Sequence, residues 1–271
     1  MSRLITIFVI CLFPSLLFAA GPPRIWFDQG HGQRFAVDRP GPLQLTGFAR
    51  LLAEQGGRVE TGRQALDSGM LEQVDVLVLS GAFKPYRSQE IDAVERFLRG
   101  GGRLAVMLHI APPFGDLLYR LGVDFSNGVI REREQVLNGD PLNFRVTDFA
   151  DHPLTRGLQG FNLYGGWALI NTDQRARVIA RTGPEAWVDL NRDQRLNGND
   201  AVQSFGVVVV GESGKGAFVV FADDAIFQNR FLPENRQLAD NLVRWLLRRP
   251  LPQLALNPES VGPLLADSTS H

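Results

Sequence analysis

Nearly unbroken apolar runs alternate with amphipathic segments through the first half of the chain, and this pattern constrains the fold more than any other feature. Residues 74–79 and 104–108 are almost wholly apolar, as in strands buried on both faces of a sheet. Residues 42–55, and the stretch that Ser88 is expected to cap, carry apolar side chains at helical spacing and end at glycines. Such alternation requires right-handed crossovers. The sequence therefore predicts an α/β protein with a doubly wound, mostly parallel sheet.

The second half of the chain is predicted to be richer in strands. Residues 207–210 and 217–221 flank the glycine-rich segment 211–216, which is typical of a hairpin. A last amphipathic helix is expected over residues 234–248, before Pro250. Shorter strands are expected over residues 162–163, 168–171 and 178–181.

Residues 1–20 have the features of a secretory signal peptide. Arg3 precedes a long apolar run, and small residues around Ala20 offer a cleavage site. We therefore predict a periplasmic or secreted protein without a membrane span after cleavage, with an uncleaved N-terminal anchor as the alternative. The remaining chain is predicted to form one domain over residues 21–250, followed by a flexible tail over residues 251–271.

Charge and cysteine content exclude several classes of function. The 28 basic and 29 acidic residues give a formal net charge of -1, so no bulk attraction to nucleic acid or to an acidic membrane is expected. The single cysteine, Cys11, lies in the apolar run that cleavage would remove. A cysteine-free mature chain has no disulfide, no thiol nucleophile and no cysteine-ligated metal.

Polar residues suited to a ligand site follow the first predicted strand, residues 24–28. Asp28, His31 and Gln33 lie in a segment whose two glycines let the backbone turn sharply. A carboxylate orients an imidazole, which can then serve as a base, an acid or a metal ligand. The alternative is that these side chains only form hydrogen bonds with the loop backbone.

Other polar residues are expected at the same place, because loops at the carboxyl ends of strands in an open α/β sheet meet at one edge. Ser80 and His109 follow the next two buried strands, and Asp223 and Asp224 join them if the strand over residues 217–221 is parallel. For His109 the alternative is a hydrogen-bonded residue beneath the sheet edge. The candidate catalytic residues are Asp28, His31, His109 and Asp223. The candidate ligand-binding residues are Asp28, His31, Gln33 and His109.

The segment over residues 189–200 is rich in oxygen-bearing side chains. Their spacing is the one by which EF-hand-type loops surround Ca²⁺. Gln194 replaces the usual glycine, however, and an aspartate replaces the final glutamate. The segment predicts a structural calcium site, with an Asn/Asp/Gly-rich turn as the alternative. The candidate ligands are Asp189, Asn191, Asp193, Asn197 and Asp200.

Three other patterns are not interpreted as sites. The segment 211–216 lacks the first glycine and the final Ser or Thr of a phosphate loop. Ser80 lacks the Gly-x-Ser-x-Gly elbow that exposes a nucleophile. Residues 151–153, Asp-His-Pro, are typical of a turn.

The order of these pieces over residues 24–249 resembles that of a class I glutamine-amidotransferase-like domain. More narrowly, it is similar to a bacterial exported or membrane-linked family of the domain-of-unknown-function 4350 type. The resemblance implies a flavodoxin-like fold. The matching segments are residues 28–33, 75–79, 90–104, 214–223 and 241–246.

The resemblance also shows a departure. In amidotransferases, the strand that corresponds to residues 104–108 is followed by a nucleophilic cysteine in a Gly-x-Cys-x-Gly elbow. Here His109 follows, with no thiol, which excludes glutamine hydrolysis by that mechanism. Relatives without the cysteine often act as binding or accessory modules, some beside exporters and gliding machinery.

Two functions follow from these observations. The first is an exported, non-catalytic module that binds a small molecule, a glycan or an envelope protein. The second is a hydrolase in which Asp28 orients His31. In that hydrolase His31 activates water directly, or with a metal ion also contacted by His109 or Asp223.

Overall fold

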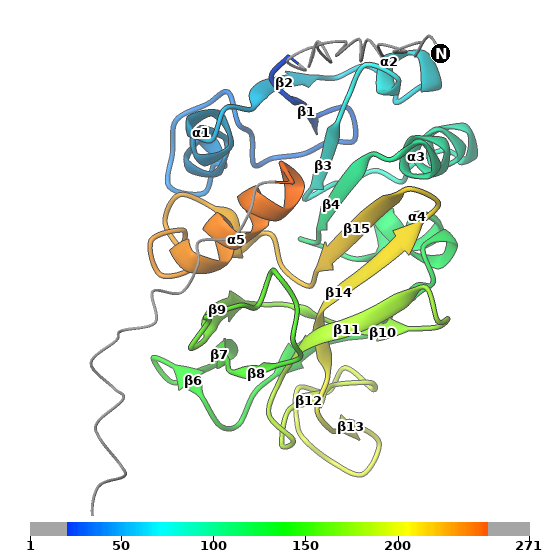
Figure 1. Cartoon of the computed structure of the whole chain (residues 1–271). Coiled ribbons are helices and arrows are strands. Elements are labelled where there is room, and N and C mark those ends of the chain that lie inside the picture. The colour runs from blue at the N-terminus through cyan, green and yellow to red at the C-terminus, as the bar shows by residue number, and fades with distance from the viewer. Residues whose placement is uncertain (1–20, 249–271) are drawn as a thin grey trace, which may run out of the picture.

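The computed structural model describes residues 21–248 (Figure 1). The signal peptide predicted over residues 1–20 and the tail predicted over residues 251–271 lie outside the described residues. Between residues 21 and 248, no helix is both long and apolar enough to span a bilayer.

Five parallel strands form one half of the main sheet. They are β1 (Arg24–Asp28), β2 (Arg58–Gly62), β3 (Val76–Ser80), β4 (Arg103–Met107) and β15 (Gly216–Phe221). Their spatial order is β2-β1-β3-β4-β15, the order 2-1-3-4-5 of flavodoxin-like doubly wound sheets. The order reverses between β1 and β3, so the loops after these two strands border the crevice where such sheets bind ligands.

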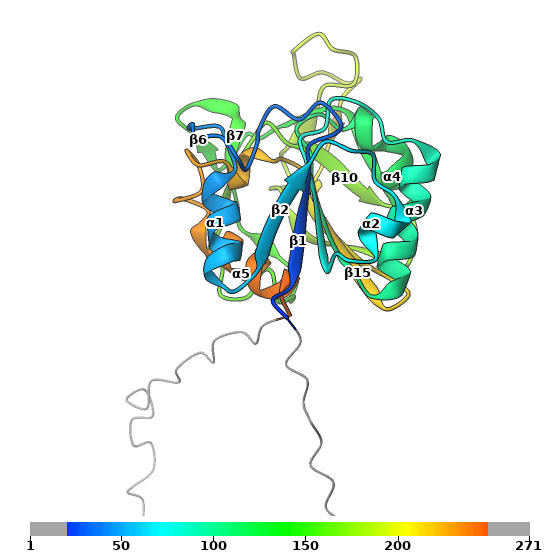
Figure 2. The ribbon, with the colours of Figure 1, turned by 90° about the horizontal axis from the view of Figure 1, so that it is seen from above.

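Helices cover both faces of this parallel half (Figure 2). One face carries α1 (Thr46–Glu54) and α5 (Arg236–Leu246), and the other carries α2 (Ser68–Leu71), α3 (Ser88–Gly100) and α4 (Gly115–Arg120). Every residue of β3 and β15 is buried, as expected for strands covered on both sides. Short 3-10 turns, η1 (Pro112–Phe114) and η2 (Ala225–Phe227), complete the helical elements of the described chain.

The other half of the sheet is antiparallel, so the expectation of a mostly parallel sheet is wrong. The protein is an α/β protein with a mixed sheet, parallel in its N-terminal βα units and antiparallel in its C-terminal part. After α4 no crossover helix separates successive strands, and strands joined by short loops pair antiparallel. The strands on the main path are β14 (Gly206–Ser213), β10 (Trp167–Asn171), β5 (Val123–Arg131), β12 (Trp187–Val188) and β13 (Ala201–Val202).

Short strands extend this antiparallel part. On the main sheet, β11 (Ala176–Arg181) pairs with β14 and with β8 (Asp148–Phe149). A small separate sheet has the order β6-β7-β9. Its strands are β6 (Val136–Leu137), β7 (Asp140–Val146) and β9 (Phe161–Tyr164). Strands β5 to β8 were not predicted from the sequence, because the buried positions of β5 and β7 follow no regular alternation.

Distant side chains determine where the first and last helices begin. The amide of Gly47 donates to Asn229 Oδ1 at 2.7 Å, so α1 begins at Thr46 rather than at Pro42. The Glu234 carboxylate accepts from the Tyr164 hydroxyl at 2.7 Å, so this residue fixes β9 instead of extending α5. Helix α3 is capped by Arg87 rather than Ser88.

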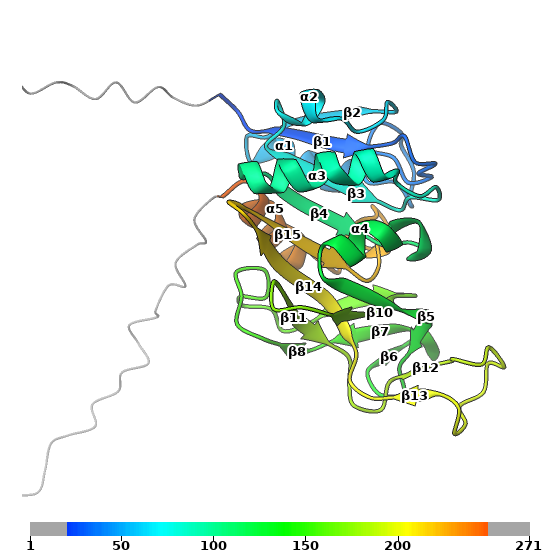
Figure 3. The ribbon, with the colours of Figure 1, turned by 90° about the vertical axis from the view of Figure 1, so that its right-hand side faces the viewer.

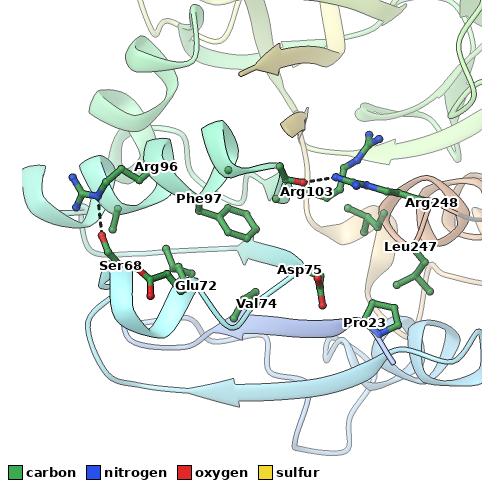
Figure 4. A pocket seen from close by; sticks show the side chains of 16 residues that line it. Pro23, Ser68, Glu72, Val74, Asp75, Arg96, Phe97, Arg103, Leu247 and Arg248 are labelled. Atoms are coloured by element: carbon green, nitrogen blue, oxygen red, sulfur yellow. Dashed lines mark hydrogen bonds between the residues drawn. The ribbon is translucent and has the colours of Figure 1, made fainter. Parts of the chain in front are cut away.

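A cavity of about 590 Å³ lies at the amino ends of the parallel strands (Figure 4). Pro23 and Arg248, close to the two ends of the described chain, both line it. Two of its polar groups donate hydrogen bonds to other residues that line it. Arg96 Nε donates to Ser68 Oγ at 2.8 Å, and the Arg248 guanidinium donates to the carbonyl of Gly101. The polar residues predicted as a site, which follow β1, β3, β4 and β15, lie at the opposite end of the strands.

Gly206 lies where β14 pairs with β10, and we predict that Gly206→Ala destabilises the protein. Leu169 of β10 lies directly opposite Gly206 of β14. A Cβ at Gly206 would therefore lie 2.5 Å from the Leu169 carbonyl oxygen. The backbone must shift to admit it, at a cost of about 1–3 kcal/mol of unfolding free energy. Urea unfolding measures the loss. Gly100→Ala is the control, because nothing lies within 4 Å of a Cβ there. Equal stabilities for the two variants would contradict the prediction.

Candidate functional site

The structure places the predicted polar residues at one edge of the parallel strands. Because β15 is parallel to β4, the carboxyl ends of β1, β3, β4 and β15 point the same way (Figure 3). Asp28 and Ser80 are the last residues of their strands, and His109, Asp223 and Asp224 follow theirs by two or three residues. These residues do not form one constellation, however. Asp28 belongs to a hydrogen-bonded group around His31, and Asp224 belongs to a second group around His109. Within residues 21–248, the side chains of Ser80 and Asp223 form no hydrogen bond with either histidine.

His31 is buried between two carboxylates. Its Nδ1 lies 2.7 Å from Asp28 Oδ2, and its Nε2 lies 3.1 Å from Glu90 Oε1. The ring also stacks on Tyr86, with centroids 3.9 Å apart. All four side chains are buried. The imidazole is therefore held at both nitrogens and on one face.

The hydrogen-bonding capacity of Asp28 is also used within the loop. Its Oδ1 accepts from the amide of Gly30 at 2.9 Å, and its Oδ2 accepts from Gln33 Nε2 at 2.7 Å and from the Tyr86 hydroxyl at 2.9 Å. Gln33 Oε1 in turn accepts from the amide of His31 at 2.8 Å. These contacts make Asp28, His31 and Gln33 residues that hold the loops in place.

The carboxylates decide the charge of His31. Burial opposes protonation of the ring, but the hydrogen bonds and charges of Asp28 and Glu90 together raise the pKa of His31. Burial would raise the pKa of Glu90, yet the amide of Arg87 and the His31 ring lower it. An imidazolium that donates from both nitrogens has no lone pair to accept a proton. In this arrangement His31 is not placed to act as a general base.

His109 is held differently. Its Nδ1 lies 3.2 Å from Asp224 Oδ1, which also accepts from Gln228 Nε2 at 3.3 Å. Asp224 is fully buried, whereas the His109 side chain is 38% exposed. The hydrogen bond with Asp224 raises the pKa of His109 against the effect of burial. Within residues 21–248, Nε2 of His109 makes no hydrogen bond, so this nitrogen is free to face a ligand.

Two aromatic rings lie beside the imidazole of His109. Phe35, in the loop after β1, meets the imidazole edge-on with centroids 4.8 Å apart, and Phe83, after β3, lies at 5.4 Å. The Arg34 guanidinium stands 4.6 Å from the centroid of the Phe83 ring. Trp167 Nε1 donates to the His109 carbonyl at 3.3 Å. His109 is thus a fixed, partly exposed imidazole in an aromatic setting.

Asp223 lies inward from this surface. It is buried, its carboxylate accepts from the amides of Tyr164 at 2.7 Å and Ala225 at 2.9 Å, and burial together with Asp224 raises its pKa to about 8. In the described chain, Ser80 Oγ and Asp224 Oδ2 are buried without a hydrogen-bond partner. No group of three or more His, Asp or Glu side chains in residues 21–248 is arranged to hold a metal ion.

The loop over residues 189–200 joins β12 to β13, far along the sheet from β1 (Figure 3). The Asp189 carboxylate accepts from the amides of Asp193 at 3.2 Å and Gln194 at 2.8 Å, and Asp200 accepts from that of Asn197 at 2.8 Å. Gln194 has a φ of 61°, the left-handed conformation that EF-hand-type loops assign to glycine. These hydrogen bonds close the loop as a turn. Calcium binding stays a prediction.

Several residues of the edge had not been singled out as site residues from the sequence. Tyr86 and Glu90 complete the His31 group, and Phe35 and Phe83 flank His109. The signals that mark them are local. Phe35, Phe83 and Tyr86 lie in loops after buried strands, and Glu90 stands three residues after the helix cap, where a carboxylate binds the cap amide at 2.9 Å.

The fold and this edge define the class. The chain has the class I glutamine amidotransferase-like fold, with His109 after the strand where the resemblance expects a cysteine. It belongs to the family described as "Domain of unknown function (DUF4350)", which matches residues 37–243. The expected resemblance is therefore confirmed. No curated protein matches the sequence.

Solved structures share the fold at low sequence identity. The N-terminal domain of mmIFT52 matches with a TM-score of 0.66 and 17% identity over 82% of this chain and 97% of that one. A putative ThuA-like protein from Bacteroides uniformis matches with a TM-score of 0.53 and 14% identity over 86% and 95%. A β-galactosidase from Rahnella sp. R3 matches with a TM-score of 0.50 and 17% identity over 82% of this chain but only 31% of that one.

We predict that His31→Gln lowers the unfolding free energy by about 3–5 kcal/mol near neutral pH, because it leaves two buried carboxylates without their cation. The pKa of His31 in the folded state lies above the ordinary 6.5, so its stabilisation is complete below pH 6.5. It is lost as the pH rises through the folded pKa. The stability difference between wild type and His31→Gln should therefore narrow above pH 6.5, as measured by urea unfolding at several pH values.

The control is His152→Gln, for which the stability difference from wild type should depend on pH in the opposite direction. Burial and Arg177 lower the pKa of His152 to about 4. The stabilisation from the neutral ring is complete above pH 6.5 and is lost as the pH falls toward 4. A stability difference for His31→Gln that does not change with pH would show that the ring is not held as a cation.

For the loop over residues 189–200, we predict that Ca²⁺ raises the melting temperature and that Asp189→Ala removes the rise. A bound ion stabilises only the folded state. Thermal unfolding with Ca²⁺ and with chelator measures the shift. Asp38→Ala, at an exposed aspartate outside the loop, is the control. The same melting temperature with and without Ca²⁺ would leave only the turn interpretation.

Proposed function

We propose that the protein is an exported, non-catalytic binding module that holds a ligand or a protein partner at the carboxyl-end loops of its parallel strands. One observation carries the proposal. The imidazole that the sequence offered as a catalytic base, His31, is buried and engaged at both nitrogens, by Asp28 and Glu90. A group held in this way fixes loop positions, and fixed loops are what a recognition surface requires.

The surface next to that group has the composition of a binding site. His109 presents a partly exposed imidazole beside Phe35 and Phe83, with the Arg34 guanidinium over the Phe83 ring. Aromatic rings and guanidinium groups are enriched where proteins bind partners, because they bury a large area and still form hydrogen bonds. His109 and Phe83 are therefore the residues whose loss should weaken recognition.

A modular role agrees with the way the fold is used elsewhere. In the Rahnella β-galactosidase it accounts for less than a third of the chain, so it exists there as one part of a longer protein. Export to the periplasm or the medium rests on the apolar N-terminal run with its small-residue cleavage site. A small molecule, a glycan and an envelope protein all fit such a module.

A hydrolase is the second candidate, and one observation favours it. His109 has its Nδ1 held by the buried Asp224 and its Nε2 free, which is the arrangement of an oriented general base. In this version Asp224 and His109 take the roles first expected of Asp28 and His31. The unpartnered hydroxyl of Ser80 lies buried at the end of β3.

One set of variants decides between the two. We predict that His109→Ala and Phe83→Ala reduce partner capture by about ten-fold, the loss expected when one well-placed contact is removed. Purified protein would be cross-linked in a bacterial envelope extract and in a ligand library, and bound components quantified by mass spectrometry. Arg50→Ala, on the exposed side of α1, is the control.

The same proteins would be assayed on a panel of esters, amides and glycosides. Turnover that disappears in His109→Ala would support the hydrolase and contradict the binding module. Equal capture by wild type, His109→Ala and Phe83→Ala would also contradict the binding module.

A further inference from the structure

We propose that a second cavity at the same edge binds the oxyanion group of a small ligand, a phosphate or a carboxylate. The cavity has a volume of about 210 Å³, and Gly30, His31, Arg63, Lys84, Arg87 and Glu90 are among the residues that line it. The inference rests on the proposed function, because the same loops form both surfaces. His109 is not part of this cavity.

Three cations from two loops, one after β2 and one between β3 and α3, line the cavity. Arg63 comes from the loop after β2, Lys84 from the loop after β3, and Arg87 caps α3. Across residues 21–248, none of the three joins an ion pair or donates a side-chain hydrogen bond, whereas Arg24 and Arg120 both pair with carboxylates. Like charges in one cavity repel each other, and a bound anion would replace this repulsion by attraction to the anion.

The buried His31 group holds the segments that carry these cations. The His31 carbonyl accepts from the amides of Phe83 and Lys84, both at 2.9 Å. Glu90 accepts from the amide of Leu66 at 3.1 Å and from that of Arg87 at 2.9 Å. The cations are thus attached to backbone that is already ordered. A binding site formed before the ligand arrives loses less entropy when the ligand binds.

Gly30 allows two of the loops that line the cavity, those after β1 and β2, to approach each other closely. A Cβ at Gly30 would lie 2.9 Å from the Arg63 carbonyl oxygen, so the loop after β1 can approach the loop after β2 only with glycine at this position. The glycine of the motif therefore serves the close approach that forms one wall of the cavity.

The floor of the cavity leaves the cations free to bind a ligand. Both oxygens of Glu90 are engaged, Oε1 by the amide of Leu66 and the His31 ring and Oε2 by the amide of Arg87. Asp28, Glu90 and His31 hydrogen-bond one another, and Arg63, Lys84 and Arg87 are the cations that line the cavity. The amino end of α3 adds a favourable dipole for an anion.

The position and size of the cavity define the ligand class. It lies among the loops after β1, β2 and β3, at the reversal of strand order where doubly wound sheets bind ligands. A volume of about 210 Å³ admits a compact headgroup. Lysine and arginine together provide a point charge and forked donors, which suit phosphate and carboxylate oxygens.

Calorimetric titration with inorganic phosphate and with succinate, at constant ionic strength and pH 7.5, tests the inference and separates the two sources of the oxyanion. We expect saturable binding of at least one of these anions. Lys84→Gln and Arg87→Gln should weaken it roughly ten-fold each, the loss of one charge-assisted hydrogen bond. Arg50→Gln, with the same change of charge on α1, should bind as wild type does. The substituted side chains are exposed, so unchanged melting temperatures confirm that the variants fold.

Absence of saturable binding of both anions would overturn the inference, as would equal affinities for wild type, Lys84→Gln and Arg87→Gln. The outcome is separable from that of the proposed function. If the anions do not bind but capture depends on His109, only the cavity assignment fails. If the anions bind and capture is independent of His109, the cavity assignment stands and the proposed partner surface fails.

Discussion

A buried imidazolium between two carboxylates is the interaction on which the functional edge depends. His31 joins Asp28 at the end of β1 to Glu90 in the first turn of α3, and Glu90 also holds the amide of Leu66 after β2. One ionic group thereby fixes three connections of the parallel sheet. Buried ion pairs contribute little net stability because desolvation offsets their attraction, but breaking one is costly. The group therefore specifies the positions of the loops more than it stabilises the fold.

Two histidines at the same edge have different chemistry because they have different numbers of carboxylate partners. His31 has two and is buried, so both of its nitrogens are engaged by carboxylates. His109 has one, Asp224, and its other nitrogen remains open beside Phe35 and Phe83. The polar motif over residues 28–33 is the most prominent candidate site in the sequence. In the structure it holds the loops beside His109 in place and is not itself the exposed surface around His109. Phe83 and His109, which we propose to contact a partner, lie in the loops after β3 and β4.

The sequence predicted the parallel half well because its signals are local. Apolar runs, helical spacing and the rule that loops meet at the carboxyl ends of strands place Asp28, Ser80 and His109 at one edge. Pairings between distant residues were not accessible in this way. Glu90 reaches His31 across the fold, and Asn229 provides the amide acceptor for α1 from far along the chain. In the antiparallel half, β9, β10, β11 and the β14–β15 hairpin match strands that the sequence predicted. Strands β5 to β8 and the order of the sheet were not predicted, because register among short strands depends on tertiary contacts that no local period records.

Pro23 and Arg248 both line the cavity at the amino ends of the strands, so the chain enters and leaves the domain at one pole (Figures 3 and 4). Neighbouring entry and exit points are the geometry that lets a domain be inserted into a host protein or carried on a tether. Anything joined to either junction approaches from the pole opposite the loops. The loop edge therefore points away from the attached part, whether that part is joined near Pro23 or near Arg248.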